Sequence, residues 1–209
     1  MAIKRQNYLL KKVKPVFIMI FFSALLFILT SWGIFFDLAS NIGYFFFYII
    51  CYFFALIVLL PILIIKRFGV GFLLFIPYAV IGSFIDFYME WVKNPVLKNP
   101  LNAIGWGIFA LLIGLSADIS YKFLPDFSSK FWKPVIIGII IGVVNFLLSM
   151  IALKYFYLTE ELFFTKFISI AYWAFPWLLI NSAFGGYTAY TISEKNWFFE
   201  RLSRNCTQK

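Results

Sequence analysis

Residues 134–152 read PVIIGIIIGVVNFLLSMIA, an uncharged run in which Asn145 and Ser149 are the polar side chains. An α-helix rises about 1.5 Å per residue, so roughly twenty such residues cross the ~30 Å hydrocarbon core of a bilayer. Apolar runs of similar length recur along the chain, and 63% of its 209 residues are hydrophobic while 13% are charged. Soluble domains contain about 45–50% apolar and about 25% charged residues. The chain is therefore predicted to be an integral membrane protein.

Six apolar runs predict an all-α fold, a bundle of about six transmembrane helices. Their approximate ranges are 15–36, 44–65, 68–91, 101–121, 133–157 and 167–192. Together they define a transmembrane domain over 15–192, between a basic tail at 1–14 and a second tail at 193–209. The first run is too long for the apolar segment of a signal peptide and no cleavage pattern follows it, so we interpret it as a retained span.

The positions of Lys and Arg predict how these spans are oriented. Fourteen of the 18 basic residues fall in the two tails and in the loops after the second and fourth spans. The other side of the predicted topology holds Lys93, Lys98, Lys154 and Lys166. Basic residues concentrate on the cytoplasmic side of membrane proteins, so both termini are predicted to be cytoplasmic in a multi-pass protein of the cell membrane. The net charge of +9 mostly reflects this bias, and the expected partner is the lipid bilayer rather than nucleic acid.

Small or polar residues recur every three or four positions in each of the last four spans, which places each set on one helix face. The sets are Ala79, Ser83, Asp86 and Glu90; Gly107, Ala110, Gly114 and Asp118; Gly138, Gly142, Asn145 and Ser149; and Trp173, Trp177, Asn181 and Gly185. Small faces let helix backbones approach closely in a membrane. We predict that these four helices form a packed bundle, and we interpret the glycines and alanines as packing seams.

Asp86 and Glu90 are the first candidates for a binding site, because a carboxylate in a membrane needs a cation, water or a proton. Two interpretations stay open. The carboxylates either reach the interface beside Lys93, or they face the bundle and attract a cationic ligand.

Trp173 and Trp177 share a helix face with Asn181 and reach deeper than interfacial anchors need to. Aromatic faces near carboxylates suit a planar or cationic ligand through stacking and cation–π attraction. Asn145 and Asn181 lie near the middle of their spans, where a buried amide needs a partner. They either hydrogen-bond to each other or contact the ring nitrogens of a ligand.

Asp118 lies near the cytoplasmic end of the fourth span, with Lys122 four residues further along. An acid followed by a base at this spacing favours an ion pair along one helix. We therefore predict a salt bridge between these two side chains.

The absence of catalytic motifs from the sequence argues against an enzyme. There is no histidine, which removes the commonest general base and a common metal ligand. Cys51 lies in an apolar run and Cys206 in the C-terminal tail, so neither a disulfide nor a thiolate metal cluster is expected. The chain has no phosphate-binding glycine loop, no zinc-protease motif and no Gly-x-Ser-x-Gly element. We expect no cofactor and no chemical step.

An order of features over about Ile76 to Tyr190 resembles the substrate-binding membrane subunits, or S components, of energy-coupling factor (ECF) vitamin transporters. An acid-bearing helix, AVIGSFIDFYMEW, leads into the loop KNPVLKNP and then the small-residue helix GWGIFALLIGLSADISYKF. A basic loop follows, and then the helices containing VIIGIIIGVVNFLL and INSAFGGYTAY. The nearest group is the one associated with hydroxymethylpyrimidine and other thiamine precursors.

The resemblance implies a six-helix subunit that captures a vitamin or precursor from outside and works with a membrane coupling subunit and two cytoplasmic ATPases. By this analogy Asp86 and Glu90 supply negative charge, Trp173 and Trp177 stack on a planar heterocycle, and Asn181 and Asn145 hydrogen-bond to it. The family's first helix often carries an Ala-x-x-x-Ala seam, which FFSALLFILTSWG at 21–33 lacks. The alternatives are a non-catalytic accessory or scaffold subunit of a membrane complex, and a small enzyme acting on lipid.

Overall fold

A computed structural model of the chain describes residues 15–29, 43–93, 101–152 and 169–194. Within these ranges the chain forms six helices and no strand, which confirms the all-α prediction. The helices are Pro15–Leu29, α2 (Gly43–Ile65), α3 (Val70–Lys93), α4 (Leu101–Phe123), α5 (Trp132–Ala152) and α7 (Ser169–Glu194). Where a predicted and an observed helix boundary both fall near described residues, they differ by no more than about two positions.

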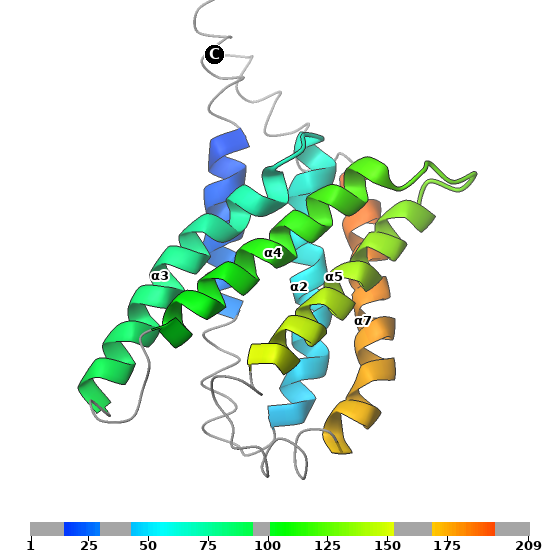
Figure 1. Ribbon diagram of the computed structural model, residues 1–209. Coiled ribbons are helices and arrows are strands. Elements are labelled where there is room, and N and C mark those ends of the chain that lie inside the picture. Colours follow the sequence, from blue (N-terminus) through cyan, green and yellow to red (C-terminus); the bar gives the residue numbers. More distant parts are fainter. Residues whose placement is uncertain (1–14, 30–42, 94–100, 153–168, 195–209) are drawn as a thin grey trace, which may run out of the picture.

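The helices alternate in direction, so the same ends gather on one side of the molecule (Figure 1). That side holds Lys66, Arg67, Lys122, Lys130 and Lys133, and we call it the basic end. The helix Pro15–Leu29 starts there and α7 finishes there (Figure 1). Consecutive described helices are therefore antiparallel.

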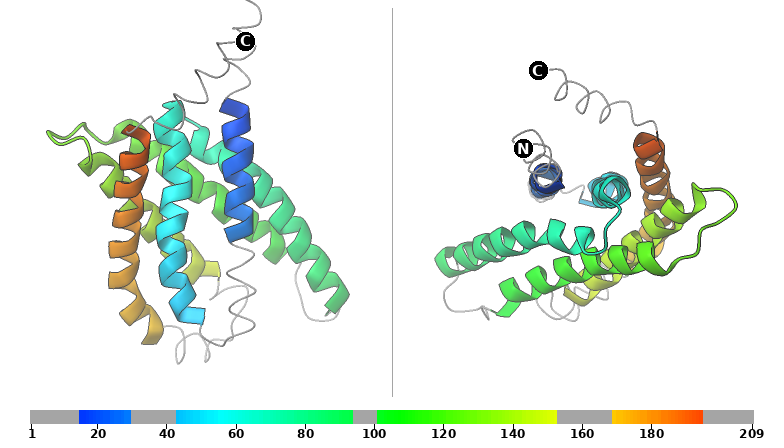
Figure 2. Two further views of the ribbon diagram at one scale, coloured as in Figure 1. Left: turned by 180° about the vertical axis from the view of Figure 1, so that it is seen from behind. Right: turned by 90° about the horizontal axis from the view of Figure 1, so that it is seen from above.

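α2 occupies the centre of the bundle and packs against α7 and α5 on one side and α3 and α4 on the other (Figures 1 and 2). Its Val58, Leu59 and Ile62 are completely buried. The sequence predicts that the last four of the six apolar runs form a packed bundle. The structure adds α2 to this bundle as its central helix. Bulky side chains on α2 fill the space that remains between the pairs α3–α4 and α5–α7.

The N-terminal helix packs against the core through Phe22 and Leu26. Its one buried polar group is satisfied, because the Ser23 hydroxyl donates to the carbonyl oxygen of Leu74, 3.0 Å away on α3. A buried hydroxyl without such a partner would be costly in an apolar interior.

The glycines of the predicted stripes lie at helix–helix contacts, as expected, whereas Trp177 of the α7 stripe is exposed. A Cβ on Gly71 would lie 2.6 Å from the carbonyl oxygen of Gly114, and a Cβ on Gly107 would lie 2.6 Å from the Ser83 hydroxyl. On the other pair, a Cβ on Gly138 would meet the carbonyl oxygen of Ser182 and lie 3.2 Å from Gly186. The helices therefore approach closely where a glycine on one helix faces a glycine or a serine on the other.

One helix in the described part, Trp132–Ile151, has both the length and the apolar composition that crossing a membrane requires. The apolar segments Pro15–Leu29, Cys51–Ile65 and Val70–Phe84 are shorter.

Replacing Gly138 by alanine should destabilise the fold, because the new methyl group would overlap the Ser182 carbonyl at the α5–α7 contact. Overpacking of this kind costs about 1–3 kcal/mol. Thermal unfolding of the purified variants in one detergent measures it. Gly82→Ala is the matched control, since nothing lies within 4 Å of the added methyl group, and it should leave stability equal or raised. Equal melting temperatures of the two variants would contradict the close packing of α5 on α7 at Gly138.

Candidate functional site

The predicted binding residues lie in the part of the bundle away from the basic end. Asp86 and Glu90 belong to the C-terminal half of α3 and Trp173 to the beginning of α7, and the side chains of all three lie outside the described part. α3 and α7 are on opposite sides of α2 (Figures 1 and 2). α3 packs mainly on α4, and α7 packs on α2 and α5. The acidic and aromatic candidates are thus on helices that do not form a main contact with each other.

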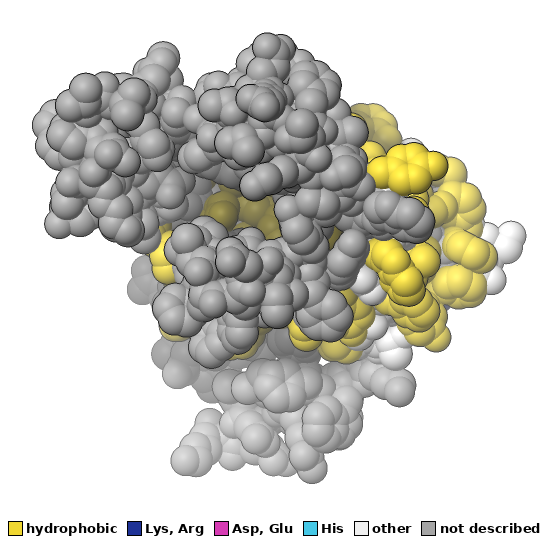
Figure 3. Space-filling view, turned by 90° about the horizontal axis from the view of Figure 1, so that it is seen from below, with side chains coloured by type: hydrophobic (Ala, Val, Ile, Leu, Met, Phe, Trp, Pro, Cys, Tyr) yellow, Lys and Arg dark blue, Asp and Glu magenta, His cyan; other side chains and the backbone are white. Residues whose placement is uncertain are grey.

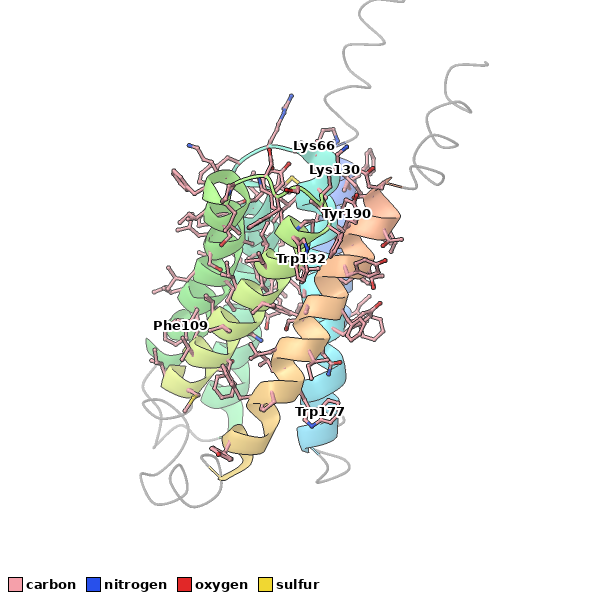
Figure 4. All side chains as sticks on the ribbon, turned by 90° about the vertical axis from the view of Figure 1, so that its right-hand side faces the viewer. Lys66, Phe109, Lys130, Trp132, Trp177 and Tyr190 are labelled. Atoms are coloured by element: carbon pink, nitrogen blue, oxygen red, sulfur yellow. The ribbon has the colours of Figure 1, made fainter. Side chains whose placement is uncertain are left out.

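Trp177 is described, and 58% of its surface is exposed. Figure 4 shows it near the end of α7 that is remote from Lys66 and Lys130. The surrounding described helices do not enclose this indole. An exposed tryptophan near a helix end also fits an interfacial anchor.

Asn145 and Asn181 are both half-buried, on α5 and α7. These two helices are antiparallel, with Gly138 at the level of Gly186 and Gly142 at the level of Ser182. Asn181 is therefore level with Gly142, while Asn145 lies about one helical turn further along α5. The register places the two amides at different levels of the bundle.

The predicted ion pair between Asp118 and Lys122 is wrong. Asp118 is completely buried, and its two carboxylate oxygens accept hydrogen bonds from the backbone N–H groups of Gly71 and Phe72, at 2.9 and 2.8 Å. Lys122 instead lies over aromatic rings, with Nζ 5.2 Å from the Phe68 centroid and 5.4 Å from that of Phe123. No ion pair joins Asp118 and Lys122 in the part of the chain that the structure describes.

Asp118 caps α3 from a neighbouring helix. The first N–H groups of a helix have no partner within it and carry partial positive charge, so a carboxylate there is favourable. Gly71 makes the approach possible, because a Cβ at that position would lie 3.3 Å from the Asp118 carboxyl carbon. The spacing from Gly114 to Asp118 indicated this face of α4, but the partner on α3 could not be read from the spacing alone.

The pocket that the described residues form lies at the basic end and has a volume of about 450 Å³. The ends of α2, α4, α5 and α7 and the loop between α4 and α5 surround it. Its lining residues are Leu63, Lys66, Tyr121, Asp126, Phe127, Ser128, Lys130, Lys133, Pro134, Tyr190, Ser193 and Glu194. In the view of Figure 4, Lys66, Lys130 and Tyr190 gather at this end of the bundle.

Lys133 is the most constrained lysine of the pocket. Its Nζ donates to Asp126 Oδ1 at 2.8 Å and lies 5.3 Å from the centroid of the Tyr121 ring. The hydrogen bond and the charge of Lys133 lower the pKa of the exposed Asp126 carboxyl, so the pair persists to lower pH than an isolated aspartate would allow. From the sequence alone, these lysines serve only to predict which loops lie on the cytoplasmic side.

The described residues offer little to a catalytic mechanism. They contain no group of three or more His, Cys, Asp or Glu side chains that could hold a metal ion. The buried Ser182 hydroxyl has no hydrogen-bond partner among them, but it packs against Gly142 inside the α5–α7 seam, where no substrate has room.

Comparison of the chain with protein families, with characterised proteins and with solved structures finds no significant match.

Removing the Asp118 carboxylate should loosen α3 from α4. Asp118→Ala leaves two buried N–H groups without their acceptors, which should lower the free energy of unfolding by about 2 kcal/mol or more. Asp118→Asn keeps one acceptor, so its stability should lie between that of Asp118→Ala and that of the original protein. Lys122→Gln is the control and should change stability little, whereas the ion-pair interpretation requires comparable losses at both positions. Thermal unfolding in detergent measures all three.

Proposed function

We propose that the chain is a multi-pass membrane protein that captures a small planar nitrogen heterocycle for uptake, in the manner of an S component of an ECF-type vitamin transporter. It has no enzymatic step in this proposal. The observation that carries the membrane part is the outer surface of the helices, whose described side chains are apolar and uncharged between the ends of the bundle.

Large hydrophobic side chains point outward from every described helix. Among the most exposed are Phe17, Phe21, Val80, Phe84, Ile108, Leu147 and Phe184, each at least half exposed. The described side chains visible from the end opposite the basic end are nearly all hydrophobic (Figure 3). Soluble monomers rarely expose contiguous apolar patches larger than a few hundred Å². The free-energy cost of exposing apolar side chains to water is absent in a hydrocarbon environment.

The described part of this surface carries no charged side chain. Among the described side chains, every charged group belongs to the basic end except Asp118, and Asp118 is buried against α3. Helices of 21 to 26 residues have lengths of roughly 30–40 Å. These lengths match a bilayer with the basic end at the cytoplasmic surface.

The transport part of the proposal is supported by the order of sequence features and by the six antiparallel helices. Asp86, Glu90, Trp173 and Trp177 belong to helix ends on the side that would face outward. In this proposal the carboxylates attract the ligand, the indoles stack on it, and Asn181 and Asn145 donate or accept hydrogen bonds. An ECF coupling subunit and its ATPases would supply the energy.

The ligand proposal is tested by mass spectrometry of small molecules released from the purified protein, and by thermal shift with thiamine and its pyrimidine precursor. A stoichiometric heterocycle, or a melting temperature that rises with ligand concentration, is the expected result. Asp86→Asn should weaken binding by about tenfold or more, since it removes a charge-assisted contact. Asp126→Asn at the basic end is the matched control and should bind normally. Unchanged affinity of the Asp86 variant would remove that residue from the site.

A non-catalytic accessory subunit is the second candidate. It is favoured by the exposed Trp177 and by the way the glycine seams are filled with helix backbone rather than left open for a ligand. Folded protein that neither retains nor responds to a heterocycle would support this second function.

The orientation can be tested with the two cysteines. A membrane-impermeant maleimide should modify Cys206 in inverted vesicles and leave intact cells unlabelled, because the C-terminal tail is expected in the cytoplasm. Cys51 is an internal control, since only 2% of it is exposed and it should not react in the folded protein. Labelling of Cys206 in intact cells would contradict the proposed orientation.

A further inference from the structure

At the pocket of the basic end, side chains from distant parts of the sequence converge on one space. Lys66 follows α2, Lys130 lies in the loop before α5, and Tyr190 comes from the last turns of α7. A volume of about 450 Å³ lies in the range of small-molecule sites, roughly 300–1,000 Å³.

Three lysines and two carboxylates line the pocket, and they are not equivalent. Asp126 is already paired with Lys133 at 2.8 Å. Within the described ranges neither Lys66 nor Lys130 forms an ion pair, and Glu194 is the remaining acid of the lining. Besides the Lys133–Asp126 pair, the lining therefore holds two ammonium groups and one carboxylate.

The position of Lys66 is fixed by the backbone. Its φ is 53°, in the left-handed region, and its N–H donates to the Ile62 carbonyl oxygen at 2.9 Å, which closes the last turn of α2. A lysine is uncommon in this conformation, which Gly or Asn adopts more readily at helix ends. Its Cα is held at the pocket even though the side chain is exposed.

Neutral donors lie beside the lysines. Tyr121, Tyr190 and Ser128 are lining residues that carry hydroxyl groups, while the Ser193 hydroxyl donates to the Tyr190 carbonyl at 2.8 Å. An ammonium pair with hydroxyl donors suits an anion that presents several oxygens, because each oxygen can accept a separate charge-assisted hydrogen bond. Phosphate has this form, and the remaining volume leaves room for the group that carries it.

We infer that this pocket binds a phosphate group, carried either by an anionic phospholipid of the cytoplasmic leaflet or by a small phosphorylated solute. Basic pockets between helix ends on the cytoplasmic side are suited to lipid head groups. The lipid source rests on the proposed membrane orientation and the solute source does not. Neither source depends on the heterocycle proposal, because the two sites are at opposite ends of the helices.

The test uses the full-length protein in nanodiscs of phosphatidylcholine alone, or of phosphatidylcholine with phosphatidylglycerol. Thermal unfolding is measured in both, with and without inorganic phosphate at constant ionic strength, and native mass spectrometry counts retained lipid. Lys66→Gln combined with Lys130→Gln removes the two available charges. Lys122→Gln is the matched control, since Lys122 is exposed at the same end but does not line the pocket.

We expect phosphatidylglycerol or phosphate to raise the melting temperature of the original protein and of Lys122→Gln. The double variant should bind at least about tenfold more weakly, because it loses charge-assisted hydrogen bonds. A response to phosphate in phosphatidylcholine alone identifies a solute site, and a response confined to phosphatidylglycerol identifies a head-group site. No response to either, or equal losses in the double variant and in Lys122→Gln, would overturn the inference. Loss of heterocycle binding in Asp86→Asn would not change the response to phosphate or phosphatidylglycerol, so the two proposals can fail independently.

Discussion

Direct contact between helix backbones is the constraint on which the rest of this structure depends. Two helix backbones can approach this closely only where the facing positions carry small side chains or none, and the close packing adds dispersion attraction. Gly71 with Gly114, and Gly138 with Gly186, are positions without a side chain on either helix, and Ser182 adds a position with a small one. They determine which helices pair and at what level.

The elements of this fold could be predicted from the sequence, and so could the faces that pack. Apolar runs located each helix, because length and composition alone decide whether a segment suits a bilayer. Glycine spacing identified the packing face of α4 and of α5. The role of α2 was not predictable in the same way, since a helix made of bulky apolar residues has no periodic feature that separates a central position from a lipid-facing one. The central position of α2 follows from the tertiary structure, because α2 fills the space between the pairs α3–α4 and α5–α7.

The candidate sites show a second limit of reasoning along one chain. Asp118 and Lys122 fit a pattern within one helix, yet the carboxylate satisfies the start of another helix about forty-seven residues earlier in the sequence. The basic pocket combines Lys66, Lys130 and Lys133 from two loops and a helix start, and periodicity gives no information about such a combination. Conversely, Asp86 and Trp177 are related by the chemistry of the predicted site, but their helices are separated by α2. The distribution of charge along the sequence predicts at which end of the bundle a lysine lies. Which residues surround that lysine is known only from the tertiary structure.

The packing of α2 against α7 has a consequence for how the protein is made. These helices share the most extensive contact in the bundle, where Gly185 approaches the Tyr52 carbonyl and the Tyr52 hydroxyl donates to Thr188 at 3.0 Å. Chains emerge from the ribosome N-terminus first. The α3–α4 hairpin can assemble as soon as it is synthesised, and α5 can then pack on α4, whereas the surfaces of α2 and α5 that contact α7 stay uncovered until the final helix is made. A nascent chain that stops before α7 therefore presents two unoccupied seams at once, and the arrival of the last segment is the event that closes the bundle.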